Sequence, residues 1–263
     1  MFTKEELKAQ IRAMGITSGD TVMVHSALRA IGPVENGADG IIDAFREVLT
    51  DGLLLIPTHT WAVVTKKQPI FDVRTTVPNI GTLPRVAAFR PDGVRSLHPT
   101  HSITGFGKNA AAFLAGEERS GTPTPVGGVM QRLGQMGAKI LLVGVGNDKN
   151  TFLHTVDEEL DLPDRLERES YPLTIVDAAG NRHTTQFRSH CCSRSEDVSM
   201  NYPNYEQALV DTGAQTLGKL GNATVRIVDA AQCRAVVARI LRNADRDVAV
   251  EPMTIPTDWY RAL

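Results

Sequence analysis

The chain has 263 residues, of which 42% are hydrophobic and 22% are charged, so it is able to bury a sizeable core as an ordinary soluble protein. Its formal net charge of -2 and its pI near 6.4 provide no general attraction to nucleic acid or to an anionic membrane. We therefore expect no nucleic-acid partner and no membrane partner, and a cationic ligand has to be bound by a local group of carboxylates.

Cysteine usage and the N-terminal residues indicate the cellular compartment. Cys191, Cys192 and Cys233 are not the even, spaced set that is typical of a secreted disulfide scaffold. The first seven residues carry acidic charge where a signal peptide needs an apolar core, and no apolar run approaches about 18 residues. We expect a cytoplasmic protein.

The first predicted element is a short amphipathic helix. Thr3 and Glu6 have the spacing of a capping box, and Gly15 is a stop signal. Between these signals, apolar residues recur on one helical face at Leu7, Ile11 and Met14.

Three compact apolar runs then predict buried strands. They cover residues 21–25, 52–57 and 139–145, and helical segments such as 37–49 separate them. This alternation predicts an α/β fold, with a compact mixed sheet flanked by helices. Because the chain contains no repeat and no Pro/Gly/Ser linker, we expect a single domain over residues 1–263.

The pattern changes in residues 173–187, where two strand-like runs flank a turn at Gly180 and Asn181. This arrangement is typical of an antiparallel hairpin. We expect the hairpin to belong to a smaller α+β lobe, at roughly residues 165–205, that packs on the rest of the domain.

The first polar cluster, residues 95–102, has no helical or strand alternation and is expected to form a loop. It contains His98, His101 and Ser102. Polar residues of such a loop either bind a ligand or only hydrogen-bond to the neighbouring backbone, and the residues alone leave both interpretations open.

The second cluster, residues 144–158, leads from a strand end through glycines and an Asn/Thr cap into a helix. His154 and Asp157 share a face of that helix. A carboxylate that accepts a hydrogen bond from one imidazole nitrogen fixes the tautomer and makes the other nitrogen a better proton acceptor. The pair therefore indicates a general base, although most pairs with this spacing are plain surface contacts.

The third cluster, residues 188–194, follows the hairpin. His190 is a candidate base, and Cys191 or Cys192 is a candidate nucleophile or metal ligand. The alternative is that all three are buried structural residues. Adjacent cysteines point to opposite faces of an extended chain, so both cannot easily bind one metal ion.

Together these clusters resemble the aminoglycoside 3-N-acetyltransferase family, from about Val22 to Cys192. The order of the matching pieces along the chain makes the resemblance specific. The pieces are residues 24–32 (VHSALRAIG), 56–61 (IPTHTW), 78–84 (PNIGTLP), 98–102 (HPTHS), 121–123 (GTP) and 142–154.

The resemblance implies a compact α/β fold with an α+β lobe, acetyl-CoA as cosubstrate, an amine of an aminocyclitol antibiotic as acceptor, and no metal. A homodimer is left open. The residues assigned to the donor site are Ser26, Ala27 and Leu28 in a turn with free N–H groups, together with His98, His101 and Ser102 of the loop. The residues expected to bind the cationic acceptor are Thr58, Glu196 and Asp197. The acidic candidates are chosen by charge and also include Asp157 and Glu158. The alternative is that Glu196 and Asp197 belong to an ordinary solvated surface.

Acetyl transfer to an amine needs a general base, because the amine is mostly protonated near neutral pH. We expect direct transfer from acetyl-CoA rather than an acetyl-cysteine intermediate. The expected base is His154 or His190, with His154 preferred, and Asp157 or Glu158 orients it. The family commonly has Glu three residues after the motif histidine, where this chain has Asp157, so the pairing of carboxylate and histidine stays open.

Two other functions fit parts of the sequence. A non-catalytic CoA- or antibiotic-binding protein would keep the fold without turnover, although the joint presence of His154, Asp157 and His190 argues against lost activity. A metal-dependent hydrolase would surround zinc with imidazoles and a carboxylate, although no HxH or HExxH pair is present. Its candidate ligands are His59, His98, His101, His154, His190 and Asp157.

Overall fold

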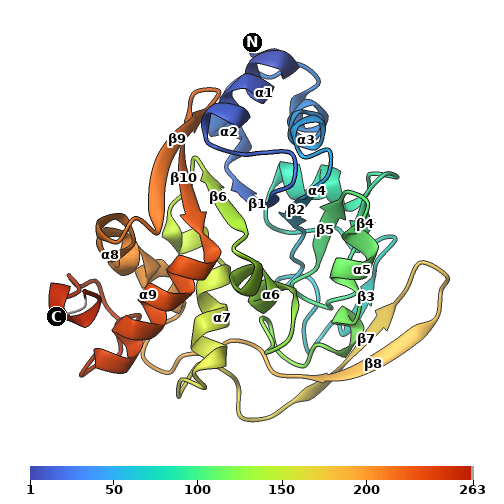
Figure 1. Ribbon diagram of the computed structural model, residues 1–263. Helices are drawn as coiled ribbons and strands as arrows, with labels where there is room; N and C mark the ends of the chain where they lie inside the picture. The colour runs from blue at the N-terminus through green and yellow to red at the C-terminus, as the bar shows by residue number, and fades with distance from the viewer. Residues whose placement is uncertain (262–263) are drawn as a thin grey trace.

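A seven-stranded mixed sheet forms the centre of the structure, a computed structural model that describes residues 1–261 (Figure 1). Its strands lie in the order β4-β5-β2-β1-β6-β10-β9. Their bounds are β1 Thr21–Ser26, β2 Leu53–Pro57, β4 Val94–Arg95, β5 Ile103–Phe106, β6 Lys139–Val143, β9 Gln215–Leu220 and β10 Ala223–Asp229.

Strand β1 lies in the middle of this sheet and pairs in parallel with β2 and with β6. Alternate residues of β1 enter two separate cores, Val22 and Val24 one core and Met23 the other. Strand β6 divides its residues in the same way, with Leu141 in one core and Leu142 in the other. Because both faces of the sheet are buried, these strands read as continuous apolar runs.

Helices cover both faces of the sheet (Figure 1). One face carries α1 Lys4–Ala13, α3 Gly37–Val48 and α4 Thr82–Ala88, and the other carries α6 Val129–Met136, α7 Phe152–Glu159, α8 Glu206–Asp211 and α9 Ala230–Asn243. The short helical segments are α2 Leu28–Ile31, α5 Ala110–Leu114, η1 Glu117–Arg119, η2 Asn147–Lys149, η3 Val198–Tyr205 and η4 Thr257–Trp259.

A second, three-stranded sheet has the order β3-β7-β8. Strands β7 Tyr171–Val176 and β8 Arg182–Phe187 form the predicted antiparallel hairpin, which extends from the body of the molecule in Figure 1. The third strand, β3 Ile70–Asp72, comes from the first half of the chain and pairs in parallel with β7. The sequence patterns did not predict this strand, because three residues are too few to show a periodicity.

The predicted fold class is confirmed. The first helix has the expected capping box at Thr3 and Glu6, and the three predicted apolar runs are β1, β2 and β6. The C-terminal segment, which the sequence patterns did not place, adds β10 antiparallel to β6 and β9 antiparallel to β10. Within residues 1–261, no helix combines the length and the apolar content that are needed to cross a membrane.

The connections determine where polar residues gather. Parallel strands β1, β2 and β6 run in the same direction, so their carboxyl ends lie at one edge of the sheet. His25 is the next-to-last residue of β1, His59 follows β2, and Val145 follows β6. These segments form the base of the cavity described below.

Gly144, directly after β6, provides a test of the close packing at this edge of the sheet. It has a φ of +67°, and an added Cβ would lie 2.4 Å from the Cβ of Ala30. We predict that Gly144→Ala lowers the free energy of unfolding by about 2–4 kcal/mol, from left-handed backbone strain and overpacking. The measurement is urea unfolding.

The matched control is Gly137, at the C-cap of α6. It has a φ of +66°, but an added Cβ meets nothing within 4 Å. Gly137→Ala should therefore show the backbone strain alone, about 1–2 kcal/mol. Equal losses for the two variants would contradict the close approach of Gly144 to Ala30.

Candidate active site

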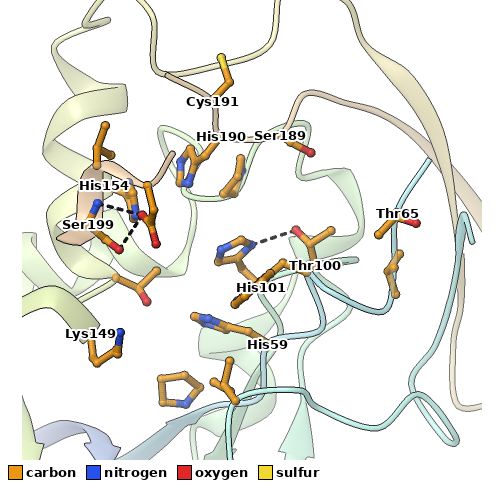
Figure 2. A pocket seen from close by; sticks show the side chains of 18 of the residues that line it. His59, Thr65, Thr100, His101, Lys149, His154, Ser189, His190, Cys191 and Ser199 are labelled. Atoms are coloured by element: carbon orange, nitrogen blue, oxygen red, sulfur yellow. Dashed lines mark hydrogen bonds between the residues drawn. The ribbon is translucent and has the colours of Figure 1, made fainter. Parts of the chain in front are cut away.

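A cavity of about 860 Å³ lies at the carboxyl edge of β1, β2 and β6. Five of the seven histidines line it, and they come from segments that are far apart in the sequence: His25, His59, His101, His154 and His190. Figure 2 shows the last four pointing into one common space. The concentration of imidazoles in one cavity identifies it as the candidate active site.

His154 is presented by helix α7, which buries Phe152, Leu153 and Val156 in the core against the sheet. Its Nδ1 lies 2.7 Å from the hydroxyl oxygen of Tyr202. Burial, together with nearby His190 and Arg165, holds the pKa of His154 well below its usual value. The imidazole is therefore neutral at pH 7 and is able to accept a proton.

Asp157 lies on the same face of α7, but it reaches His154 only through another side chain. The hydroxyl of Tyr202 donates to Asp157 Oδ2 at 2.8 Å, and Arg165 Nε donates to the same oxygen at 3.3 Å. The expectation of a direct histidine–carboxylate hydrogen bond at this spacing is thus corrected: tyrosine stands between the two groups. Burial raises the pKa of Asp157 to about 6 against the opposing Arg165 charge, so the carboxyl is mostly ionised at pH 7.

The neighbouring carboxylate, Glu158, serves the other candidate histidine. His190 Nε2 lies 2.9 Å from Glu158 Oε1, which also accepts from the backbone N–H and hydroxyl of Thr124, while Thr122 donates to Oε2. Burial alone would raise the pKa of Glu158, but these hydrogen bonds outweigh it and hold the pKa below its usual value. Glu158 is an ionised partner for His190.

The two histidines are themselves in contact. The rings of His154 and His190 stack with centroids 4.1 Å apart and an interplanar angle of 25°. Successive residues of a helix point about 100° apart, so Asp157 and Glu158 are unable to serve the same imidazole. The structure therefore brings all four predicted catalytic residues together, as two histidine–carboxylate units side by side.

The two histidines of the HPTHS loop have different surroundings: His98 supports the loop, and His101 lines the cavity. His98 Nδ1 accepts from the backbone N–H groups of Thr100 and His101, and its Nε2–H donates to the carbonyl of Thr122 at 3.0 Å. Both nitrogens are thus used by the fold, and the ring does not line the cavity. His101 does line it, with Nδ1 2.9 Å from the hydroxyl of Thr100.

Ser102 and Thr58 are also behind the cavity wall. Both are fully buried, the Ser102 hydroxyl donates to the Thr58 carbonyl, and Arg95 donates to the Ser102 oxygen. The polar atoms of His98, Ser102 and Thr58 are used in packing β2 against this loop, so the structure does not bring these three predicted residues into the cavity lining.

The predicted donor turn contributes one residue. Ser26 lines the cavity, and its buried hydroxyl has no protein partner among the described residues. Ala27 and Leu28 do not line it, and the Ala27 N–H donates to the carbonyl of Val143. The N–H of Ala27 is therefore not free for a ligand, which corrects that assignment.

Charged residues stand at the two sides of the cavity. Glu196 and Asp197 line it as predicted, close to Ser199, and Asp148 joins them. Lys66 and Lys67 follow Thr65 in the chain and line the cavity, and Figure 2 shows Thr65 on the opposite side from Ser199. Each side also holds a charge of the other sign, since Lys66 pairs with Glu167 and Asp148 pairs with Lys149, both at 3.0 Å.

Sequence reasoning missed several residues of the site. Tyr202, which contacts His154, lies in the C-terminal part of the chain, where the sequence contains no recognised motif. Asp148 lies in the matched segment 142–154, but nothing in its sequence context indicates a binding role. Trp61, Lys66 and Lys67 also line the cavity. Trp61 lies inside one of the matched motifs. Lys66 and Lys67 are adjacent in the sequence, but two neighbouring lysines do not by themselves indicate a binding site.

The environment of Cys191 at the cavity does not favour an activated thiolate. Burial and the nearby carboxylates of Asp164 and Glu167 raise the pKa of Cys191. The thiol of Cys192 donates to Asp164 at 3.5 Å. The thiolate of Cys191, which is the reactive form, is therefore disfavoured. Within residues 1–261, no group of three or more His, Cys, Asp or Glu side chains has an arrangement that could hold a metal ion.

Comparison with known proteins agrees with this fold. The family model of aminoglycoside 3-N-acetyltransferase matches residues 23–242. Aminoglycoside N(3)-acetyltransferase III of Serratia marcescens is 30% identical over 197 residues, which cover 68% of this chain and 72% of that protein.

Solved structures show the same architecture. AAC-VIa with bound sisomicin has a TM-score of 0.74 and 25% identity, and the likeness covers 92% of this chain and 99% of that one. AAC-IIIb in a binary complex with CoASH has a TM-score of 0.77 and 23% identity, with coverage of 91% and 96%. The family match and the curated relatives define the class of the protein as an acyltransferase.

The chain belongs to the aminoglycoside 3-N-acetyltransferase family. The family match extends to residue 242, so the similarity is longer than the motifs from Val22 to Cys192 indicated. Strands β9 and β10 and most of helix α9 lie inside the family match.

The buried imidazoles predict a pH-dependent stability. Burial lowers the pKa of His25 and of His98 to about 4, whereas the unfolded chain retains values near 6.5. The unfolded state therefore binds more protons between about pH 6.5 and 4, and stability falls as the pH falls through this window. Each residue should remove about 2 kcal/mol from the free energy of unfolding between pH 7 and pH 5.

Urea unfolding at the two pH values measures this change. A His25→Gln variant, which has no group to titrate at that position, should show a smaller loss on acidification than the parent chain. A free energy of unfolding that is equal at pH 7 and pH 5 would show that these rings are protonated in the folded protein.

Proposed function

We propose that this protein transfers the acetyl group of acetyl-CoA to an amine of an aminoglycoside, with His154 as the general base. The observation that carries the proposal is the neutral, half-buried His154 ring in a large cavity, stacked on His190 and linked to Asp157 through Tyr202. Family membership supports the reaction class and the aminocyclitol acceptor. The sisomicin bound to the related AAC-VIa supports a polycationic acceptor.

The proposed step is a direct transfer. The acceptor nitrogen attacks the thioester carbonyl as His154 takes its proton, and a C–N bond forms. The tetrahedral intermediate then collapses, the C–S bond breaks, and the CoA thiolate leaves and takes up a proton. The products are the N-acetylated acceptor and free CoA. The raised pKa of Cys191 supports transfer without an acetyl-cysteine intermediate.

His154 is preferred over His190 because of the partners of each ring. His190 already uses Nε2 in the contact with ionised Glu158 and stacks on His154. His154 uses Nδ1 toward Tyr202, lines the cavity, and has no hydrogen bond at Nε2 among the described residues. The second unit is proposed to pack and orient the first.

Charge distribution supports an assignment of the two substrates. The carboxylates of Asp148, Glu196 and Asp197 are proposed to attract the cationic acceptor. The lysines Lys66 and Lys67, on the side of Thr65, are proposed to attract the phosphates of the cosubstrate.

We predict that His154→Ala lowers kcat for acetyl transfer by about 10²–10⁴-fold, the usual contribution of a positioned base. The assay is release of CoA thiol from acetyl-CoA across a panel of aminoglycosides. The rise in melting temperature that CoA causes should be retained, because His154 is not assigned to cosubstrate affinity.

The control is His183→Ala, since His183 lies on β8 outside the cavity and its loss should leave kcat unchanged. Near-normal turnover at pH 7 for both His154→Ala and His190→Ala would show that no histidine base operates. Absence of thiol release with every acceptor would contradict the acetyltransferase itself.

Acceptor binding should respond to charge. We predict that Glu196→Gln raises the KM of a polycationic acceptor about two- to fivefold at low salt, as expected for an exposed carboxylate. The difference from the parent chain should shrink at 1 M salt, where the screening length falls to about 3 Å. The matched control is Asp51→Asn, because Asp51 is exposed just before β2, at the opposite end of that strand from the cavity. An acceptor KM that ignores ionic strength would contradict the assignment.

A further inference from the structure

One buried hydroxyl lies between the proposed base and its carboxylate. Tyr202 is on η3, a segment that joins the main core and comes well after α7 in the sequence. Its side chain is fully buried. Its oxygen lies 2.7 Å from His154 Nδ1 and 2.8 Å from Asp157 Oδ2, so it contacts both groups at once.

We propose that Tyr202 is a positioning residue of the reaction, which holds His154 in the tautomer that leaves Nε2 free to accept the proton. This proposal rests on the proposed function, because it acts through His154 as the base. Tyr202 itself does not line the cavity and is not proposed to touch either substrate.

The direction of the hydrogen bonds follows from counting protons. A phenol has one proton, and an ionised carboxylate has none to give, so the Tyr202 hydroxyl donates to Asp157. The phenol oxygen is then an acceptor for His154, whose Nδ1 must carry the proton. In a neutral imidazole the second nitrogen, Nε2, then has a free lone pair.

The carboxylate is fixed independently of the histidine. Arg165 donates from Nε to Asp157 and from Nη2 to Asp247 at 2.6 Å, and its side chain is only 3% exposed. Asp157 is thus tied to a buried cation through Oδ2, the oxygen that also accepts from Tyr202. Aspartate is also one methylene shorter than glutamate, and Tyr202 bridges the remaining gap.

The structure provides a matched control three residues away. Tyr205 lies on the same segment and is equally buried, but its hydroxyl has no hydrogen-bond partner among the described residues. Tyr→Phe at either position removes one oxygen from the core. Only the change at Tyr202 removes a hydrogen bond to His154.

The experiment compares Tyr202→Phe with Tyr205→Phe in steady-state acetyl transfer with acetyl-CoA and an aminoglycoside. We expect Tyr202→Phe to lower kcat about 10- to 100-fold, less than loss of the base itself. The KM values of both substrates should stay within about threefold, because no contact with either substrate is removed. Tyr205→Phe should keep kcat within about threefold.

A carboxylate that reaches His154 without the tyrosine should restore activity. Glutamate at position 157 is longer by one methylene, about 1.5 Å, and Phe at 202 leaves room where the hydroxyl was. We expect the double variant Asp157→Glu with Tyr202→Phe to recover at least tenfold of the lost kcat. A purely structural defect at Tyr202 would not be rescued in this way.

The pH profile gives a second readout. Protonated Asp157 can donate to the Tyr202 oxygen, which then donates to His154 Nδ1 and selects the wrong tautomer. Besides these groups, His190, His59 and Arg165 face His154. We expect the parent chain to lose kcat as the pH falls below about 6, and the Tyr202→Phe variant to lose this limb.

The tautomer itself can be observed in the unmodified protein. Nitrogen-15 NMR of the His154 ring at pH 7.5 should show the proton on Nδ1, and a proton on Nε2 would overturn the proposal even if Tyr202→Phe fails to fold. Normal kcat for Tyr202→Phe, or an equal fall for Tyr205→Phe, would overturn it as well. If His154→Ala is inactive and Tyr202→Phe is active, only the tyrosine proposal fails, whereas an active His154→Ala removes the proposed base too.

Discussion

The structure depends on keeping two adjacent carboxylates, Asp157 and Glu158, ionised inside the protein. A buried charge is tolerated only when it is paired and hydrogen-bonded. Asp157 takes its donors from Arg165 and Tyr202, and Glu158 takes its donors from His190 and the threonines at 122 and 124. Apart from Arg165, the donors come from three segments that pack around helix α7: the C-terminal segment, the segment after the small sheet and the loop before α6.

The same burial makes the chemistry available at neutral pH. His154 is neutral because its ring is desolvated and lies beside His190 and Arg165, so one ring nitrogen carries a free lone pair at neutral pH, as the proposed base requires. The cost is acid sensitivity, since His25 and His98 resist protonation in the folded state. A cavity rich in neutral imidazoles is thus favourable for the base and unfavourable for stability below about pH 6.

The structure gives a physical explanation for Asp157, the residue at which this chain departs from the family pattern. Glutamate at the third position after the motif histidine is common in the family, and Asp157 is shorter. The hydroxyl of Tyr202 occupies the interval between Asp157 and His154. The sequence motif and the geometry thus differ in which group touches the imidazole, although the carboxylate remains on the same helical face.

By itself the sequence determined the buried strands, the hairpin and the four residues of the two histidine–carboxylate units, because each rests on local periodicity or on a contiguous motif. The reaction class followed from the resemblance to a family, which rests on several motifs in order along the chain. It was unable to show that Asp157 and Glu158 serve different rings or that Tyr202 contacts His154. It also could not separate His101, which lines the cavity, from His98, which supports the loop. Only the tertiary structure decided these points, since hydrogen bonds between distant segments leave no pattern in the neighbouring residues.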